Sequence, residues 1–283
     1  MNIKIISAIL VLALAPLASM ACGFSVDLPP RVEAGPDVEE SITVADPDSD
    51  ETRLSLNFGA GELRLSSGAE GLVEGTVLYN VEQLKPQVIE NGGDIEIKQG
   101  NLDGLLPSDN MKNRWDLQLG DMPMDLSIDA GAYEGNMELG GLALNSLTVK
   151  DGAAHVDLSF SEPNLVEMSR MSYSTGASEV TLTGLANANF STFEFDGGAG
   201  SYTLDFSGEL QRDASVNVDS GLSELIIIVP EGVNATVSIE GGLTDINARN
   251  GWSQSGNTYS HEGSGPELTI KVNMGAGSVT LQE

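Results

Sequence analysis

The chain of 283 residues is poor in several residue types. It has one Cys, two His, two Trp and 13 basic residues against 42 acidic ones. One Cys and two His fall short of the four nitrogen or sulfur ligands that a structural zinc site needs. The formal net charge of −29 repels nucleic acid, so we expect no DNA or RNA partner. No long apolar run of helical period follows residue 21, and 33 Gly favour corners over helices.

The chain does contain a pattern that recurs eight times. Two apolar residues stand five and three positions before a Gly, such as Leu54 and Leu56, and two more stand four and six positions after it. In one copy this second pair is displaced by two, to Met137 and Leu139. The glycines are Gly59, Gly131, Gly152, Gly176, Gly198, Gly221, Gly242 and Gly275. From the second Gly onward they are about 21 to 24 residues apart, with a last interval of about 33, which indicates a stacked repeat array.

Alternation at period two places the apolar residues of each copy on one face and polar residues on the other. The Gly marks a bend where either a positive φ or close backbone packing excludes a Cβ. One copy is therefore expected to be two short strands joined by a tight corner. Stacking such units about 4.8 Å apart predicts an all-β, single-chain β-solenoid of about eight two-strand repeats. A β-sandwich is the alternative, because evenly spaced short strands also suit that fold.

Residues 1–21 have the features of a signal peptide. Lys4 precedes an apolar stretch from Ile5 to Ala18, which is too short for a comfortable membrane span. Ala21 directly before Cys22 resembles a bacterial lipobox, although Ser19 stands where Leu is expected. An exported chain with one Cys needs an explanation for it, and lipidation of Cys22 provides one. The alternative is ordinary cleavage, which would give a soluble secreted or periplasmic protein.

The remaining chain divides into three expected regions. Residues 22–50 are acidic and hold four Pro, which predicts a lipid-anchored flexible tether. Residues 51–119 form a less regular N-terminal region, with extra strands expected near 88–90, 94–98 and 115–119. Residues 120–283 form the regular solenoid. Either 42–44 or a hairpin around Trp252 is expected to cap an open end.

Acidic residues recur two positions before the corner Gly. If Asp196, Asp219 and Glu240 belong to consecutive coils, their carboxylates stack about one strand spacing apart. A weak Ca²⁺ ladder is one interpretation, and local Asx-type turns at the corner are the other. No other cofactor is expected, and no metal site is assigned.

Two further candidates concern contact and catalysis. Trp252, Tyr259 and His261 flank a hairpin turn at 255–257, so they form either a contact tip or a hairpin packed on the solenoid end. His155 begins a predicted strand and is expected on the surface. The chain has no G-x-S-x-G elbow and no distinguished carboxylate pair, so no catalytic residue is assigned.

Several segments resemble toast-rack domains. The sequence of 54–65 (LSLNFGAGELRL), Glu74–Val77 and Ile95–Lys98 resembles their N-terminal part, and Val229–Val233 and Gly275–Val279 resemble their C-terminal part. That group includes the extracytoplasmic domain of LiaF-type regulators and β-solenoid adhesins. The resemblance covers roughly 52–283 and implies the fold more than a function, since its motifs are structural corners.

These observations favour a non-enzymatic, adhesin-like binding or scaffold lipoprotein of the bacterial cell envelope. The outward Ser, Thr and Asn residues offer a flat polar face suited to a protein or a glycan at the cell surface. The expected location is extracytoplasmic, attached to the membrane through the lipid on Cys22. The first alternative is an envelope-stress regulator that acts on a membrane partner, and the second is a carbohydrate-active enzyme.

Overall fold

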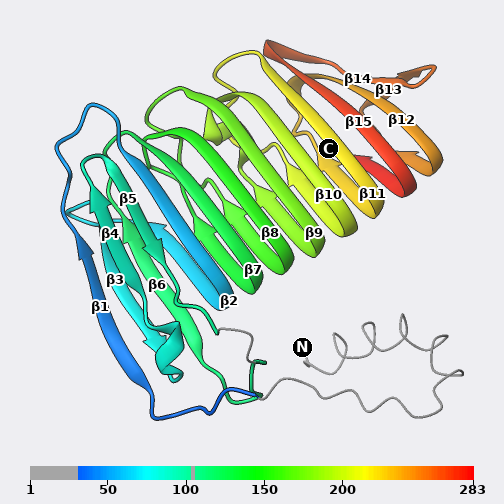
Figure 1. The fold of residues 1–283 in the computed structure, drawn as a ribbon. Coiled ribbons are helices and arrows are strands. Elements are labelled where there is room, and N and C mark those ends of the chain that lie inside the picture. The colour runs from blue at the N-terminus through cyan, green and yellow to red at the C-terminus, as the bar shows by residue number, and fades with distance from the viewer. Residues whose placement is uncertain (1–30, 103–105) are drawn as a thin grey trace, which may run out of the picture.

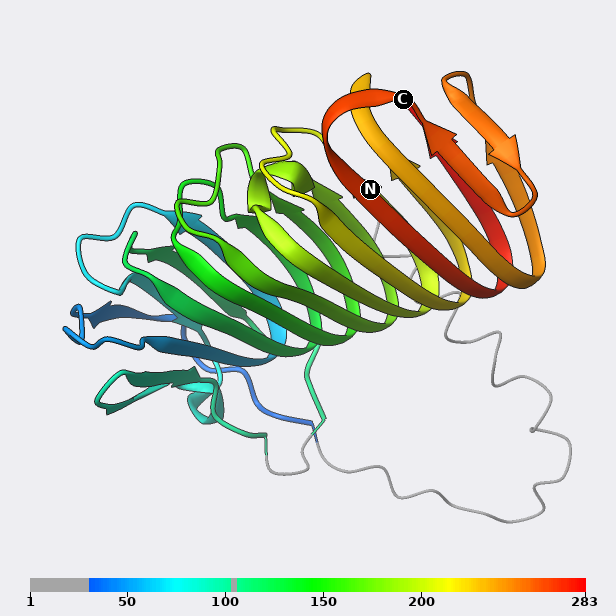
Figure 2. The same ribbon diagram turned by 90° about the horizontal axis from the view of Figure 1, so that it is seen from above.

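The computed structural model describes residues 31–102 and 106–283, and their regular secondary structure is almost entirely β-strand (Figures 1 and 2). The strands are β1 (Val38–Val44), β2 (Arg53–Ser67), β3 (Val73–Tyr79), β4 (Gln87–Asn91), β5 (Asp94–Lys98), β6 (Asn113–Leu119), β7 (Met124–Glu138), β8 (Leu144–Ser159), β9 (Met168–Thr183), β10 (Phe190–Asp205), β11 (Ala214–Ile228), β12 (Gly232–Ala248), β13 (Trp252–Ser255), β14 (Thr258–His261) and β15 (Gly263–Gln282). Two short 3-10 helices, η2 (Glu82–Leu84) and η3 (Leu185–Ala188), lie in connections.

Eight long strands, β2, β7 to β12 and β15, are the eight repeat copies. Figure 1 shows them side by side, each bent sharply partway along its length. Successive strands from β7 to β11 pair in parallel, and the pairing continues on both sides of the corner. Each copy is therefore one bent strand rather than two separate ones. The open sheet of stacked parallel coils confirms the predicted β-solenoid, and the alternative β-sandwich is wrong.

The corner glycines allow the coils to approach closely. A Cβ added at Gly198 would lie 2.2 Å from the carbonyl oxygen of Gly176, and one at Gly176 would lie 2.4 Å from that of Gly152. The corner glycines are absent from the residues with positive φ. Of the two reasons for Gly at the corner, close backbone packing is therefore the one that applies.

The inward residues of the coils form one continuous core, except at Ala248 of β12, and this core also includes Phe160 and Phe206 from the connections. The displaced pair of the Gly131 copy has a structural reason. A Cβ added at Gly135 would lie 2.7 Å from the ring of Tyr133, so this ring occupies the space of the missing apolar side chain. Met137 then takes the next inward position and is buried.

The N-terminal region closes one end of the solenoid. The first half of β2 pairs with β5, and the second half pairs with β6. The halves of the long strands before the corner Gly form a first layer, and the halves after it form a second layer. Strands β6, β3 and β1 continue the second layer in antiparallel order, and β4 pairs with β5. The extra strands expected in this region are present as β4, β5 and β6.

Strand β1 corrects the predicted tether. Ile42 and Val44 are buried against the core, because the alternation in 38–44 gives that segment one apolar face. Residue 31 also forms a bridge with Leu106, and Val32 is buried. The prediction of a flexible tether is wrong for these segments. The first part of the predicted tether, 22–30, and the predicted signal peptide lie outside the described residues.

The order of the last coils differs from their order in the sequence. Strand β15 lies between β11 and β12 and pairs in parallel with both. The hairpin of β13 and β14 then pairs with the first half of β12, from Ala235 to Ser238. The C-terminal end of the solenoid is thus β12 with its hairpin (Figure 1).

Candidate functional site

The outward surface of the first layer is a continuous polar face. Residues four positions before the corner Gly fall in register from coil to coil and form a column. In spatial order this column is Ser55, Ser127, Thr148, Ser172, Glu194, Asn217, Lys271 and Ser238. We call the outward residues two, four and six positions before the glycines the polar face. The repeat places them there because the residues between them are buried.

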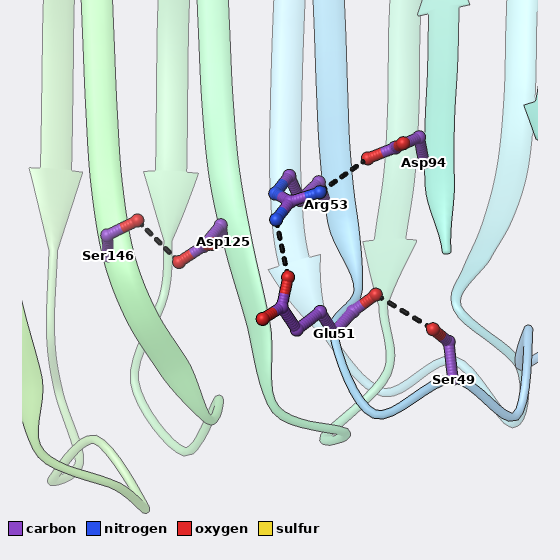
Figure 3. Close-up of polar contacts among 6 residues, drawn as sticks. All are labelled: Ser49, Glu51, Arg53, Asp94, Asp125 and Ser146. Atoms are coloured by element: carbon purple, nitrogen blue, oxygen red, sulfur yellow. Dashed lines mark hydrogen bonds and ion pairs between the residues drawn. The ribbon is translucent and has the colours of Figure 1, made fainter. Parts of the chain in front are cut away.

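Ion pairs and hydrogen bonds hold the N-terminal edge of the polar face in place (Figure 3). Arg53 donates to Asp94 at 3.1 Å and to Glu51 at 2.5 Å. The hydrogen bond with Asp94 and the charge of Glu51 raise the pKa of the Arg53 guanidinium. On the next two coils, the Ser146 hydroxyl donates to Asp125 at 2.6 Å. These contacts link β5 to β2 and β7 to β8 across the face.

An open groove of about 700 Å³ follows the corner across the C-terminal coils. Its carboxylates are Asp151, Asp196, Asp219 and Glu240, and one cation, Lys150, lies at one end. Ser, Thr, Gly, Asn and Met residues complete the lining. The groove is therefore acidic, polar and open to solvent.

The predicted ladder of three carboxylates does not form. Asp196 lies opposite Asp219, but Asn273 of β15 lies between Asp219 and Glu240. The amide of Asn273 donates to Asp219 at 2.9 Å. Within residues 31–102 and 106–283, no group of three His, Cys, Asp or Glu is placed to hold a metal ion. The predicted ladder required the three residues on consecutive coils, and the order of the coils contradicts this.

A buried hydroxyl network surrounds Asp151 on the inside of the corner. Tyr173 donates to Asp151 at 2.7 Å, and Thr175 donates to the other carboxylate oxygen. Burial, together with the nearby negative charge of Asp151, raises the pKa of Tyr133 and Tyr173. This network was not predicted from the sequence. Its signal was an Asp directly before a corner Gly, where the neighbouring copies carry Ala130 and Thr175.

The predicted contact tip is not an exposed tip. Tyr259 is 4% exposed, His261 is 3% exposed, and Trp252 is partly buried. The His261 Nδ1 lies 2.8 Å from the Val233 carbonyl oxygen, and its ring lies 5.3 Å from that of Trp252. These contacts orient the aromatic side chains onto the solenoid end. The contact-tip interpretation is wrong, and the packed hairpin is the arrangement found.

His155 lies on the outward surface of the second layer. Its Nδ1 is 3.3 Å from a carboxylate oxygen of Glu179, and both side chains are about half exposed or more. Its neighbour on the other side is Glu134. Such an exposed pair contributes little to stability. Cys22, the predicted lipidation site, lies outside the described residues.

The part of the chain that the structure describes has no helix of the length and apolarity that a membrane span requires.

Solved structures resemble the fold at low sequence identity. One is described as a "putative cell adhesion protein" from Clostridium sporogenes ATCC 15579, with 21% identity, a TM-score of 0.51, and coverage of 87% of this chain and 99% of that one. Another is a "putative adhesin" from Bacteroides fragilis NCTC 9343, with 11% identity, a TM-score of 0.47, and coverage of 87% and 97%.

A third is a "putative lipid binding protein" from Parabacteroides distasonis ATCC 8503, with 14% identity, a TM-score of 0.40, and coverage of 89% and 100%. No curated protein matches the chain. The model of the N-terminal domain of toast_rack, DUF2154, matches residues 33–183, which is more than half of the chain. The stacked coils and this match identify the chain as a member of the toast-rack family.

Proposed function

We propose that this protein is a non-enzymatic, adhesin-like binding or scaffold protein of the bacterial cell envelope. The observation that carries the proposal is the polar face, which is continuous across eight coils. Coils about 4.8 Å apart, each presenting about five residues of about 3.3 Å, give an area of roughly 550 Å². A standard interface buries about 800 Å² on each partner, so the face is a substantial fraction of one.

The chemistry of the polar face favours weak and extended contact. The exposed large hydrophobic residues in the described part of the chain are all Val, Ile or Leu, and none is aromatic. Aromatic side chains and Arg supply most of the energy at tight interfaces. A face of Ser, Thr, Asn and scattered charges therefore suits a protein or charged glycan bound through many small contacts. Anchoring many copies on one surface would add avidity to such contacts.

The comparisons support this proposal at the level of fold. The Clostridium structure carries the name of a cell adhesion protein, and its fold covers most of this chain. The corner motifs of the toast-rack family are structural, and the groove is too open to enclose a substrate. We therefore propose no catalytic role.

We also propose that lipid on Cys22 holds the protein on the outer side of the membrane. Intact mass of the mature chain tests this, since an unmodified Cys22 would contradict it.

Crosslinking in the native cells tests the binding role. A photo-reactive residue at Ser172 lies on the polar face, and one at Thr181 lies on the opposite surface of the same strand with similar partial burial. We expect a defined partner to be captured from position 172 and not from 181. Equal capture from both positions would contradict the proposal. Recovery of one membrane sensor from position 172 would favour the envelope-stress regulator, the first alternative.

A further inference from the structure

The two layers of the solenoid end differently at β12. The hairpin covers the first half of this strand, where β14 pairs with Ala235 to Ser238 and Ile239 donates to the Asn257 carbonyl oxygen. From Gly241 to Ala248, β12 pairs with β15 on one side. No described residue pairs with this segment on its other side. We call residues 241–248 the open edge.

The core is also incomplete at the open edge. Leu225, Val279 and Ile246 lie in register on β11, β15 and β12. The first two are fully buried, whereas Ile246 is only partly buried. Ala248 is exposed, although its neighbour Leu281 is buried. The apolar surface of the last coil thus lacks the second neighbouring strand that the other copies have in this layer.

A strand edge of this kind offers both main-chain and side-chain contacts. Alternate N–H and C=O groups of a parallel strand point away from its partner, and here they point to open space. Leu243 is 82% exposed on the same segment. Repeat proteins need a polar cap at each end, and an uncapped edge is a template for strand addition. An extended peptide that adds one strand would complete the sheet and cover Ile246.

The charge of the open edge selects among the occupants. Glu240 and Asp245 are exposed, and the segment contains no Lys or Arg before Arg249. A second copy would place the same acidic segment alongside, and like charges on paired strands are destabilising. The net charge of −29 adds to that repulsion. We infer that the open edge binds an extended segment of another protein with alternating basic and apolar side chains. This inference rests on the proposed binding function and names one partner class for it.

Hydrogen exchange on the full chain tests the inference with designed peptides. The probe is an alternating Lys–Val peptide of about eight residues, a typical strand length. Its controls are a Glu–Val peptide and a Lys–Val peptide with a central Pro, which keeps the charge but disrupts pairing. We expect the Lys–Val peptide to slow amide exchange in 241–248 by about ten-fold, and neither control to do so. No slowing, or equal slowing by the three peptides, would overturn the inference.

Matched variants separate the edge from general electrostatics. Asp245→Lys reverses a charge on the open edge, and Glu224→Lys makes the same reversal at the corresponding position of β11, two coils inward. We expect D245K to abolish the protection and E224K to retain it. Protection of 241–248 without peptide, together with a doubled mass in light scattering, would mean that a second copy occupies the edge. Crosslinking from Ser172 is independent of this segment, so failure of the proposed function and of this inference are distinguishable.

Discussion

The two ends of the solenoid are closed in different ways. At the N-terminal end, antiparallel strands extend both layers, and Ile42 and Val44 of β1 complete the core. At the C-terminal end, the hairpin covers only the first layer, and Ile246 remains partly exposed. The coils between them are nearly uniform because one repeat builds them all. The difference therefore adds an unpaired strand edge at the C-terminal end to the polar face that all the coils share.

The largest effect on stability should come from shortening side chains in the column of Leu225, Val279 and Ile246, once on an inner coil and once on the last coil. Leu225→Ala removes a fully buried side chain, and we expect a loss of about 2 to 5 kcal/mol in the free energy of unfolding. Ile246→Ala lies two coils away in the same column, and we expect less than about 1.5 kcal/mol because that side chain is already partly in water. Urea denaturation measures both. Equal losses would mean that the core is complete at β12.

The corner glycines sharpen the same comparison. Gly198→Ala places a Cβ 2.2 Å from the Gly176 carbonyl oxygen, and we expect a loss of about 1 to 3 kcal/mol from the forced backbone shift. Gly242→Ala places it 2.9 Å from the Gly275 carbonyl oxygen, on the last coil. There the strand has room to move, and the lower entropy of the unfolded chain offsets part of the strain. We expect a loss below about 1 kcal/mol, and thermal melting of both variants checks the order.

A smaller, pH-dependent effect on stability is expected at Glu138, the last residue of β7, and not on the exposed strand β4 of the N-terminal region. Burial alone would raise the pKa of Glu138, but hydrogen bonds from the Ser159 hydroxyl, Ser161 and the Gly140 N–H lower it below its usual value. A lowered folded-state pKa gives stability that is present above the unfolded pKa and is lost as pH falls through the folded pKa. Glu138→Gln should cost below about 1 kcal/mol near neutral pH.

That cost should disappear as pH falls from about 5 to about 3. Glu90→Gln on the exposed strand β4 is the matched control, and we expect its stability to follow the native chain throughout. Melting temperatures across this pH range give the comparison. A constant difference between E138Q and the native chain down to pH about 3 would contradict the assigned role of Glu138.

The sequence predicted the parts of the fold that repeat. Period-two alternation around each corner Gly identified eight coils, and the turn at 255–257 identified the hairpin. It did not predict the position of β15, because the interval from Gly221 to Gly242 resembles that between adjacent coils. No local pattern specifies which neighbour a strand takes. The predicted stack of three carboxylates failed for this reason, since Asn273 separates Asp219 from Glu240.

The predictions also failed where composition hid tertiary contacts. Acidic residues and Pro in 22–50 outweighed the short alternation that places Ile42 and Val44 in the core. The network around Asp151 depends on Tyr173 and Thr175 from the next coil. Such a cluster becomes visible only when the register between coils is known. The lipid on Cys22 remains a prediction.

Hydrogen exchange of the full chain without any partner tests the central claim most directly. The account predicts slow exchange in β8 to β10 and fast exchange in 241–248, while 235–239 stays protected by the hairpin. It requires the boundary between protected and unprotected amides to fall within β12. Uniform protection along the whole of β12 in a monomeric chain would contradict the half-capped end on which the account depends.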